Sequence, residues 1–157
     1  MTRALRLLAC GFLISGSACD ANESLARYVT GCDFSMEVPV KSKNCSANTV
    51  RSVHDISVDD QFVQLKYTLE ESGCLEQKTE NFTRIPRRGV TLATDDHAYA
   101  TTKTIAFRCE EGVACVQNVV STEKGQRREK LFGFTFGACN AVVQEKMRRL
   151  LGDLIKQ

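Results

Sequence analysis

Hydrophobic and polar residues alternate along much of the chain after residue 50, and this period of two predicts β-strands. The clearest case runs from Gln61 to Leu69, where Val63, Leu65 and Tyr67 alternate with polar residues. A strand with one buried face and one exposed face has this pattern. The same pattern predicts further strands over residues 53–58, 101–109, 115–122 and 131–136.

The hydrophobic period changes near the end of the chain. From Ala141 to Ile155, apolar residues recur at helical spacing, which predicts an amphipathic α-helix. Asn140 is a favourable N-cap for it, because its side-chain oxygen can accept a hydrogen bond from a free N–H of the first turn. The apolar positions of this helix are Val143, Met147, Leu150 and Leu154.

Strands followed by one helix predict an α+β fold, in which an antiparallel β-sandwich or bent sheet of about 6–7 strands is closed by the C-terminal helix. Residues 22–50 are less regular, and only two helical turns are expected there, over residues 23–29. The element order over residues 50–156 resembles the pleckstrin-homology-like superfold, a bent β-sandwich closed at one corner by a C-terminal helix. The resemblance is one of architecture, and no residue role follows from it.

The first residues have the pattern of a secretory signal peptide. Arg3 and Arg6 precede a short apolar run over residues 7–14, and small residues follow it. The run is shorter than the roughly 20 apolar residues that a transmembrane helix needs. We expect cleavage after Ala18 or Ala21, and export to a periplasm or to the exterior.

Removal of residues 1–21 leaves residues 22–157, which have the length of a single globular domain. We expect no transmembrane span in them, because no later apolar run is long enough. The whole chain carries 21 basic and 19 acidic residues, a formal net charge of +2. A nearly neutral total gives no reason to expect a nucleic-acid partner.

The chain has eight cysteines, and one of them, Cys10, lies in the signal peptide. Cleavage after Ala21 leaves six, an even number that fits three disulfides in an oxidising compartment. Cleavage after Ala18 would instead make Cys19 the first residue and a candidate for a lipid anchor. The remaining six are Cys32, Cys45, Cys74, Cys109, Cys115 and Cys139.

Cys109 and Cys115 flank a five-residue turn between two predicted strands. In a symmetric hairpin they would face each other at a distance that a disulfide can close. A structural bridge is favoured over a metal site, because the chain has only two histidines. For the other four cysteines the local choice is Cys32–Cys45, which leaves Cys74–Cys139, and the remaining pairings stay open.

Two groups of basic residues fall in predicted loops. If the loops meet at one end of the sheet, their side chains could bind a phosphate, sulfate or carboxylate group. The alternative interpretation is two ordinary solvated loops. The first group is Arg84, Arg87 and Arg88, and the second is Lys124, Arg127, Arg128 and Lys130.

The chain contains no serine nucleophile elbow, glycine-rich phosphate loop or zinc-helix motif. We therefore expect a small exported, disulfide-stabilised, non-catalytic binding domain without a cofactor or metal. Its partner would be another protein or an envelope component, met through strand edges or loops. An inhibitor or immunity-type protein is one concrete form of this function.

Two alternatives belong to other functional classes. The first is a secreted hydrolase that uses His54 or His97 with an acidic partner. The second is a lipid- or anion-binding module that uses the two basic loops. Geometry separates them, because the first needs a carboxylate or hydroxyl near a histidine and the second needs the loops to converge.

Overall fold

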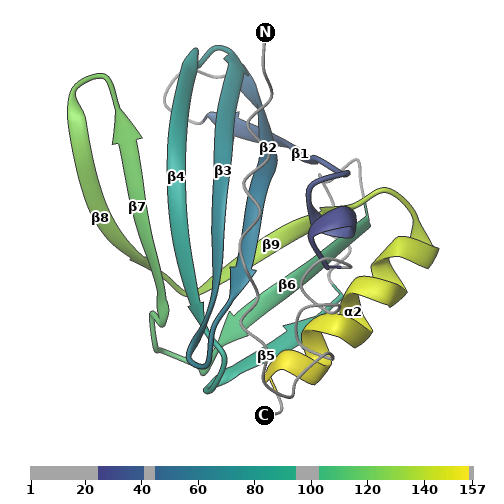
Figure 1. Cartoon of the computed structure of the whole chain (residues 1–157). Helices are drawn as coiled ribbons and strands as arrows, with labels where there is room; N and C mark the ends of the chain where they lie inside the picture. The colour runs from purple at the N-terminus through teal and green to yellow at the C-terminus, as the bar shows by residue number, and fades with distance from the viewer. Residues whose placement is uncertain (1–24, 41–44, 95–102, 156–157) are drawn as a thin grey trace, which may run out of the picture.

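The computed structural model describes residues 25–40, 45–94 and 103–155 (Figure 1). The predicted signal peptide over residues 1–21, the lipid site at Cys19 and the candidate histidine His97 lie outside these ranges. The described residues form nine strands and the helix α2, besides a helical segment over residues 25–29. The strands are β1 (Phe34–Val40), β2 (Cys45–Val58), β3 (Phe62–Gly73), β4 (Gln77–Pro86), β5 (Val90–Ala93), β6 (Lys103–Cys109), β7 (Val116–Thr122), β8 (Gly125–Leu131) and β9 (Gly133–Ala138), and α2 spans Ala141–Ile155.

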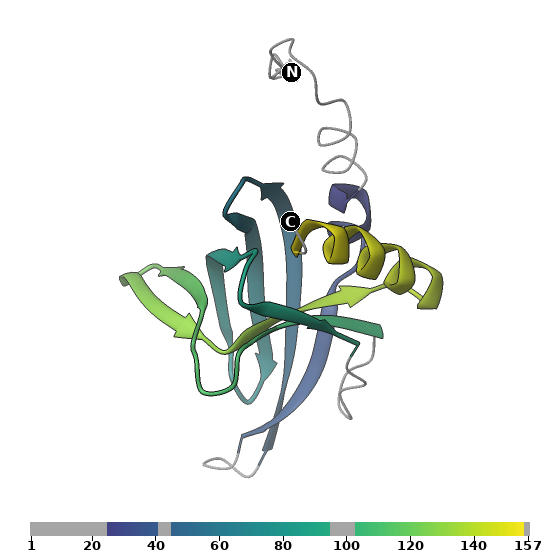
Figure 2. The ribbon, with the colours of Figure 1, turned by 90° about the horizontal axis from the view of Figure 1, so that it is seen from below.

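The strands form two antiparallel sheets. The larger has the order β1-β2-β3-β4-β7-β8, and the smaller has the order β5-β6-β9. The smaller sheet runs across one end of the larger one, and α2 packs against it, mainly on β5 and β6 (Figures 1 and 2). The predicted α+β class with a C-terminal helix is confirmed, although the described strands outnumber the six or seven expected.

The core lies where the two sheets and the helices meet. Phe107 and Phe136 are fully buried there, and edge-to-face ring contacts join Phe134 to both Tyr67 and Phe136. Met147 from α2 and Leu25 from the N-terminal helical segment complete this core without measurable exposure. The bounds of α2 agree with the predicted helix, and Asn140 Oδ1 accepts a hydrogen bond from the N–H of Val143 at 3.0 Å, as an N-cap does.

Two parts of the strand prediction are wrong. Residues 124–128, expected to form a loop, belong mostly to β8, whose charged sequence shows no hydrophobic alternation. The expected hairpin between β6 and β7 does not exist either, because β6 pairs with β5 and β9 whereas β7 pairs with β4 and β8. The chain crosses from one sheet to the other between these two strands.

The structure contains the expected bridge Cys109–Cys115 together with Cys45–Cys74 and Cys32–Cys139. Cys109–Cys115 closes the crossing between the sheets rather than a hairpin. The expected local pair Cys32–Cys45 and its complement Cys74–Cys139 are wrong, and strand register explains why. Ala47 pairs with Gly73 between β2 and β3, so Cys45 and Cys74 lie close together at the end of that pair.

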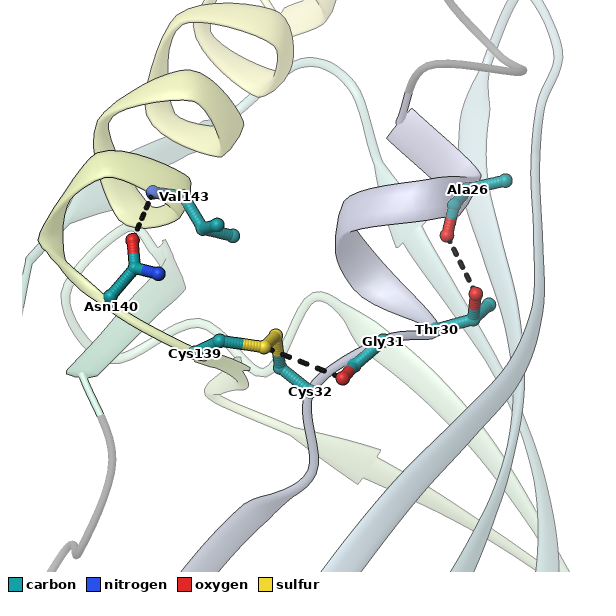
Figure 3. Close-up of a disulfide and its surroundings, with 7 residues drawn as sticks. All are labelled: Ala26, Thr30, Gly31, Cys32, Cys139, Asn140 and Val143. Atoms are coloured by element: carbon teal, nitrogen blue, oxygen red, sulfur yellow. Dashed lines mark hydrogen bonds between the residues drawn. A yellow bond between two sulfur atoms is a disulfide. The ribbon is translucent and has the colours of Figure 1, made fainter.

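Cys32–Cys139 joins the segment just before β1 to the residue before the N-cap of α2 (Figure 3). β1 and β9 approach each other here, although they belong to different sheets. A Cβ atom on Gly137 would lie only 2.5 Å from the carbonyl oxygen of Asp33, so glycine is needed for this approach.

Arg51 in β2 lies at the same junction. Its guanidinium is 4.5 Å from the ring centre of Phe134 and also faces Phe34 and Tyr67. Its Nη1 donates to the carbonyl oxygen of Thr135 in β9, and burial lowers the pKa of this arginine. Cation–π contacts and one carbonyl therefore replace a carboxylate partner and connect β1, β2, β3 and β9.

Replacing Cys32 and Cys139 by serine is expected to lower the free energy of unfolding by about 4–5 kcal/mol, because the bridge spans 107 residues and restricts the unfolded chain strongly. The matched variant Cys109→Ser/Cys115→Ser opens a loop of only 6 residues and should cost about 2 kcal/mol. Urea unfolding followed by circular dichroism measures both. Equal losses would contradict this account of the bridges.

Candidate functional site

A hollow lies on the exposed face of β4, β7 and β8. We call it the β7 groove, because β7 forms its floor. Its volume is about 570 Å³, which lies within the range of roughly 300–1,000 Å³ typical of ligand sites. Its lining residues are Phe82, Arg84, Gln117, Asn118, Val119, Arg128, Glu129 and Lys130.

Strand register brings the groove's side chains together in two rows. Arg84 of β4 pairs with Gln117 of β7, which pairs in turn with Lys130 of β8. The next row is Phe82, Val119 and Arg128. Residues directly opposite each other in a sheet point to the same face. The groove therefore has basic side chains on both walls and apolar groups from Phe82 and Val119 between them.

Arg84 is held in place by its neighbours. Its guanidinium carbon lies 4.0 Å from the ring centre of Phe62, and its Nε is buried without a hydrogen-bond partner. The nearby carboxylate of Asp59 has a lowered pKa, chiefly because the backbone N–H groups of Gln61 and Phe62 donate to it, with a smaller effect of Arg84. Asp59 thus stabilises its own turn and forms no ion pair with Arg84.

The basic side chains of the groove have no ion-pair partner among the described residues. Within the described ranges, no carboxylate makes an ion pair with Arg84, Arg128 or Lys130. Glu129 also lines the groove, but its carboxylate accepts hydrogen bonds from Asn118 at 2.8 Å and from Arg127 at 3.1 Å. Three cations therefore face one hollow, an arrangement that favours an anionic group.

The two predicted basic loops do not converge as a whole. Arg84 and Arg128, one from each group, line the same groove together with Lys130. Arg87 instead donates to the carbonyl oxygens of Leu154 at the end of α2 and of Asp59.

The remaining members of the basic groups lie outside the groove. Arg88 is exposed in the turn before β5. Lys124 and Arg127 line a second, smaller hollow of about 270 Å³ at the tip of the β7–β8 hairpin. Sequence reasoning missed Phe82, Gln117 and Val119, because only the pairing of β4, β7 and β8 places them between the cations.

A buried polar network lies on the other face of these strands. Asn118 accepts hydrogen bonds from Thr83 at 2.6 Å and from Tyr67 at 3.4 Å, and it donates to Glu129 at 2.8 Å and to Asn81 at 3.4 Å. Asn118 is only 3% exposed and Thr83 is fully buried. Satisfied buried networks fix the relative position of their strands, so this one supports the register on which the groove depends.

His54 lies near a hydroxyl and a carboxylate, as in a hydrolase, but the three groups are not arranged as catalysis requires. Thr68 Oγ1 donates to Glu80 Oε1 at 3.0 Å, and His54 Nε2 contacts the same hydroxyl. A catalytic triad places the imidazole between the hydroxyl and the carboxylate, so that it can accept the hydroxyl proton. Here the hydroxyl lies between the two groups, and Thr68 is only 5% exposed.

Within the described ranges, no group of three or more His, Cys, Asp or Glu residues could hold a metal ion. None of the helices in those ranges is both long and apolar enough to cross a membrane. Comparisons with protein-family models, curated proteins and solved structures find no match. The resemblance to the pleckstrin-homology-like superfold therefore stays an expectation about architecture.

The variant Asn118→Ala is expected to lower the free energy of unfolding by about 1–3 kcal/mol, because it leaves Thr83 and Glu129 without a buried partner. The control Gln117→Ala removes an exposed side chain of the same strand and should change stability by less than about 0.5 kcal/mol. Urea unfolding compares the two. A loss for Gln117→Ala as large as that for Asn118→Ala would exclude the network as the reason.

Proposed function

We propose that this chain is an exported, disulfide-stabilised, non-catalytic binding domain that recognises an anionic ligand in the β7 groove. The observation that supports it is the placement of Arg84, Arg128 and Lys130 around one hollow, whose one lining carboxylate, Glu129, makes its ion pair with Arg127 and not with these three cations. The partner that carries the anionic group would be another protein or an envelope component.

The three disulfides indicate an oxidising compartment, extracellular or periplasmic, because such bonds persist there. The predicted signal peptide over residues 1–21 is the proposed route to it. In the proposed form, cleavage after Ala21 releases the domain. Cleavage after Ala18 with a lipid on Cys19 is the alternative, and it would attach the same domain to a membrane surface.

The chemistry of the groove describes the expected ligand. A guanidinium presents N–H donors in a planar fork that matches carboxylate, phosphate or sulfate oxygens. Arg84 is stacked on Phe62, so less side-chain freedom is lost when it binds. Phe82 and Val119 offer apolar contact beside the charges. The ligand is therefore an anionic group attached to a part with some apolar surface.

A hydrolase is the second candidate function, and the contact of His54 with Thr68 is the observation that favours it. The order of groups at His54 is unsuitable for activating the hydroxyl, so we rank this function below binding. The variant His54→Ala separates the two functions, because it should leave anion binding unchanged if the groove is the site.

The double variant Arg128→Gln/Lys130→Gln is expected to weaken anion binding at least roughly tenfold, because it removes two charge-assisted contacts from the groove. The control Lys124→Gln/Arg88→Gln removes the same total charge at exposed positions outside the groove and leaves the Arg127–Glu129 ion pair intact. Titration with sodium phosphate, sodium sulfate and a glutamate-rich peptide, followed by NMR, measures the affinities.

Binding should also weaken as salt is added, because exposed charges are screened. Equal weakening in the two double variants would mean that net charge, and not the groove, attracts the anion. The absence of binding to all three probes would refute the proposed function.

A further inference from the structure

β8 is the open edge of the larger sheet. It pairs with β7 on one side, and no strand of the described part pairs with its other side. Figures 1 and 2 both show it at the outer margin of the molecule. The opposite edge strand, β1, contains Pro39 and approaches β9, and the edge strand β5 has only 4 residues. Of these edges, β8 is therefore the most suitable for accepting another strand.

The hairpin geometry shows which main-chain groups of β8 face outward. Thr122 pairs with Gly125 across a two-residue loop, so these two residues form a hydrogen-bonded pair. Hydrogen-bonded and non-hydrogen-bonded pairs then alternate along an antiparallel ladder. The N–H and C=O groups of Gln126, Arg128 and Lys130 consequently point to the open edge.

The same three residues have their side chains on the face of the β7 groove. Arg128 and Lys130 stand in rows with Val119 and Gln117, and Gln126 is paired with Ser121. Side chains of alternate residues in a strand share a face. A segment that bonds to the edge of β8 would therefore place every second side chain beside Arg128 and Lys130.

Charge decides which segment fits. A second copy of β8 would bring arginine and lysine side chains against Arg128 and Lys130, and like charges on neighbouring strands repel. Acidic side chains in the same positions would form charge-assisted contacts. Basic residues on this edge thus disfavour self-association and favour an acidic strand.

We propose that β8 accepts an extended acidic segment of a partner protein as an additional strand. The segment has acidic residues at alternate positions, which lie beside Arg128 and Lys130, while its main chain bonds to the outward groups of Gln126, Arg128 and Lys130. This inference rests on the proposed function and deepens it, because it states the class of partner and its mode of binding.

The test uses the oxidised protein and a synthetic peptide as long as β8 in which glutamate alternates with valine. Calorimetry measures its affinity, and hydrogen exchange measures the protection of individual amides. We expect the amides of Gln126, Arg128 and Lys130 to exchange at least roughly tenfold more slowly when the peptide is bound, since they become hydrogen-bonded. A peptide with glutamine in place of glutamate should bind at least roughly tenfold more weakly.

The variant Gln126→Pro removes one outward N–H without a change in charge, and proline is tolerated at such edge positions. It should weaken peptide binding roughly tenfold, whereas the matched control Gln126→Ala should bind as the unchanged protein does. If Gln126→Pro does not fold, the hydrogen-exchange result on the unchanged protein decides the question.

Two results would overturn the strand addition and leave the anion site intact. One is peptide binding without protection of the three amides, and the other is binding of phosphate or sulfate without binding of the peptide. If none of these probes binds, the proposed function fails together with this inference.

Discussion

The approach of β1 to β9 is the constraint on which the rest of the structure depends. Two sheets of unequal size meet there, and the contact is made by main chain against main chain at Gly137 and Asp33. Cys32–Cys139 joins the chain across this contact, and Arg51 fills the space beside it with a cation held by three aromatic rings. An apolar side chain could pack against the rings but could not also donate to the carbonyl of β9.

This junction lies at one end of the larger sheet and leaves a face at the other end uncovered. The smaller sheet packs against α2 and against the core side of the larger sheet, so its packing does not extend over the exposed face of β4, β7 and β8. Those three strands are held in register by buried polar groups around Asn118, in place of an apolar core on both sides. A groove with charged walls can form there without cost to the packing of the main core.

The sequence predicted elements whose signal is local and missed those that depend on pairing. β3 and α2 were predictable because one face of each is apolar at a regular period. β4 and β8 have polar residues on both faces, so no period marks them, and only their neighbours hold them in place.

The same reason applies to the cysteines, because a short turn predicts Cys109–Cys115 whereas Cys32–Cys139 requires the whole fold. It applies to the candidate site as well, since Arg84 and Arg128 meet through the register of β4, β7 and β8 and not through loops.

The basic residues of β8 can serve two requirements. They oppose pairing with a strand of like charge, and they attract a strand of opposite charge. Natural proteins place lysine and arginine on open edge strands to prevent unwanted pairing. Such charges exclude a partner only when it carries the same sign, and they attract one that carries the opposite sign. Specificity is a difference between two binding free energies, so repulsion of the wrong strand and attraction of the right one have the same physical source. The charges that would oppose pairing of this edge with a second copy are therefore those that would select an acidic partner.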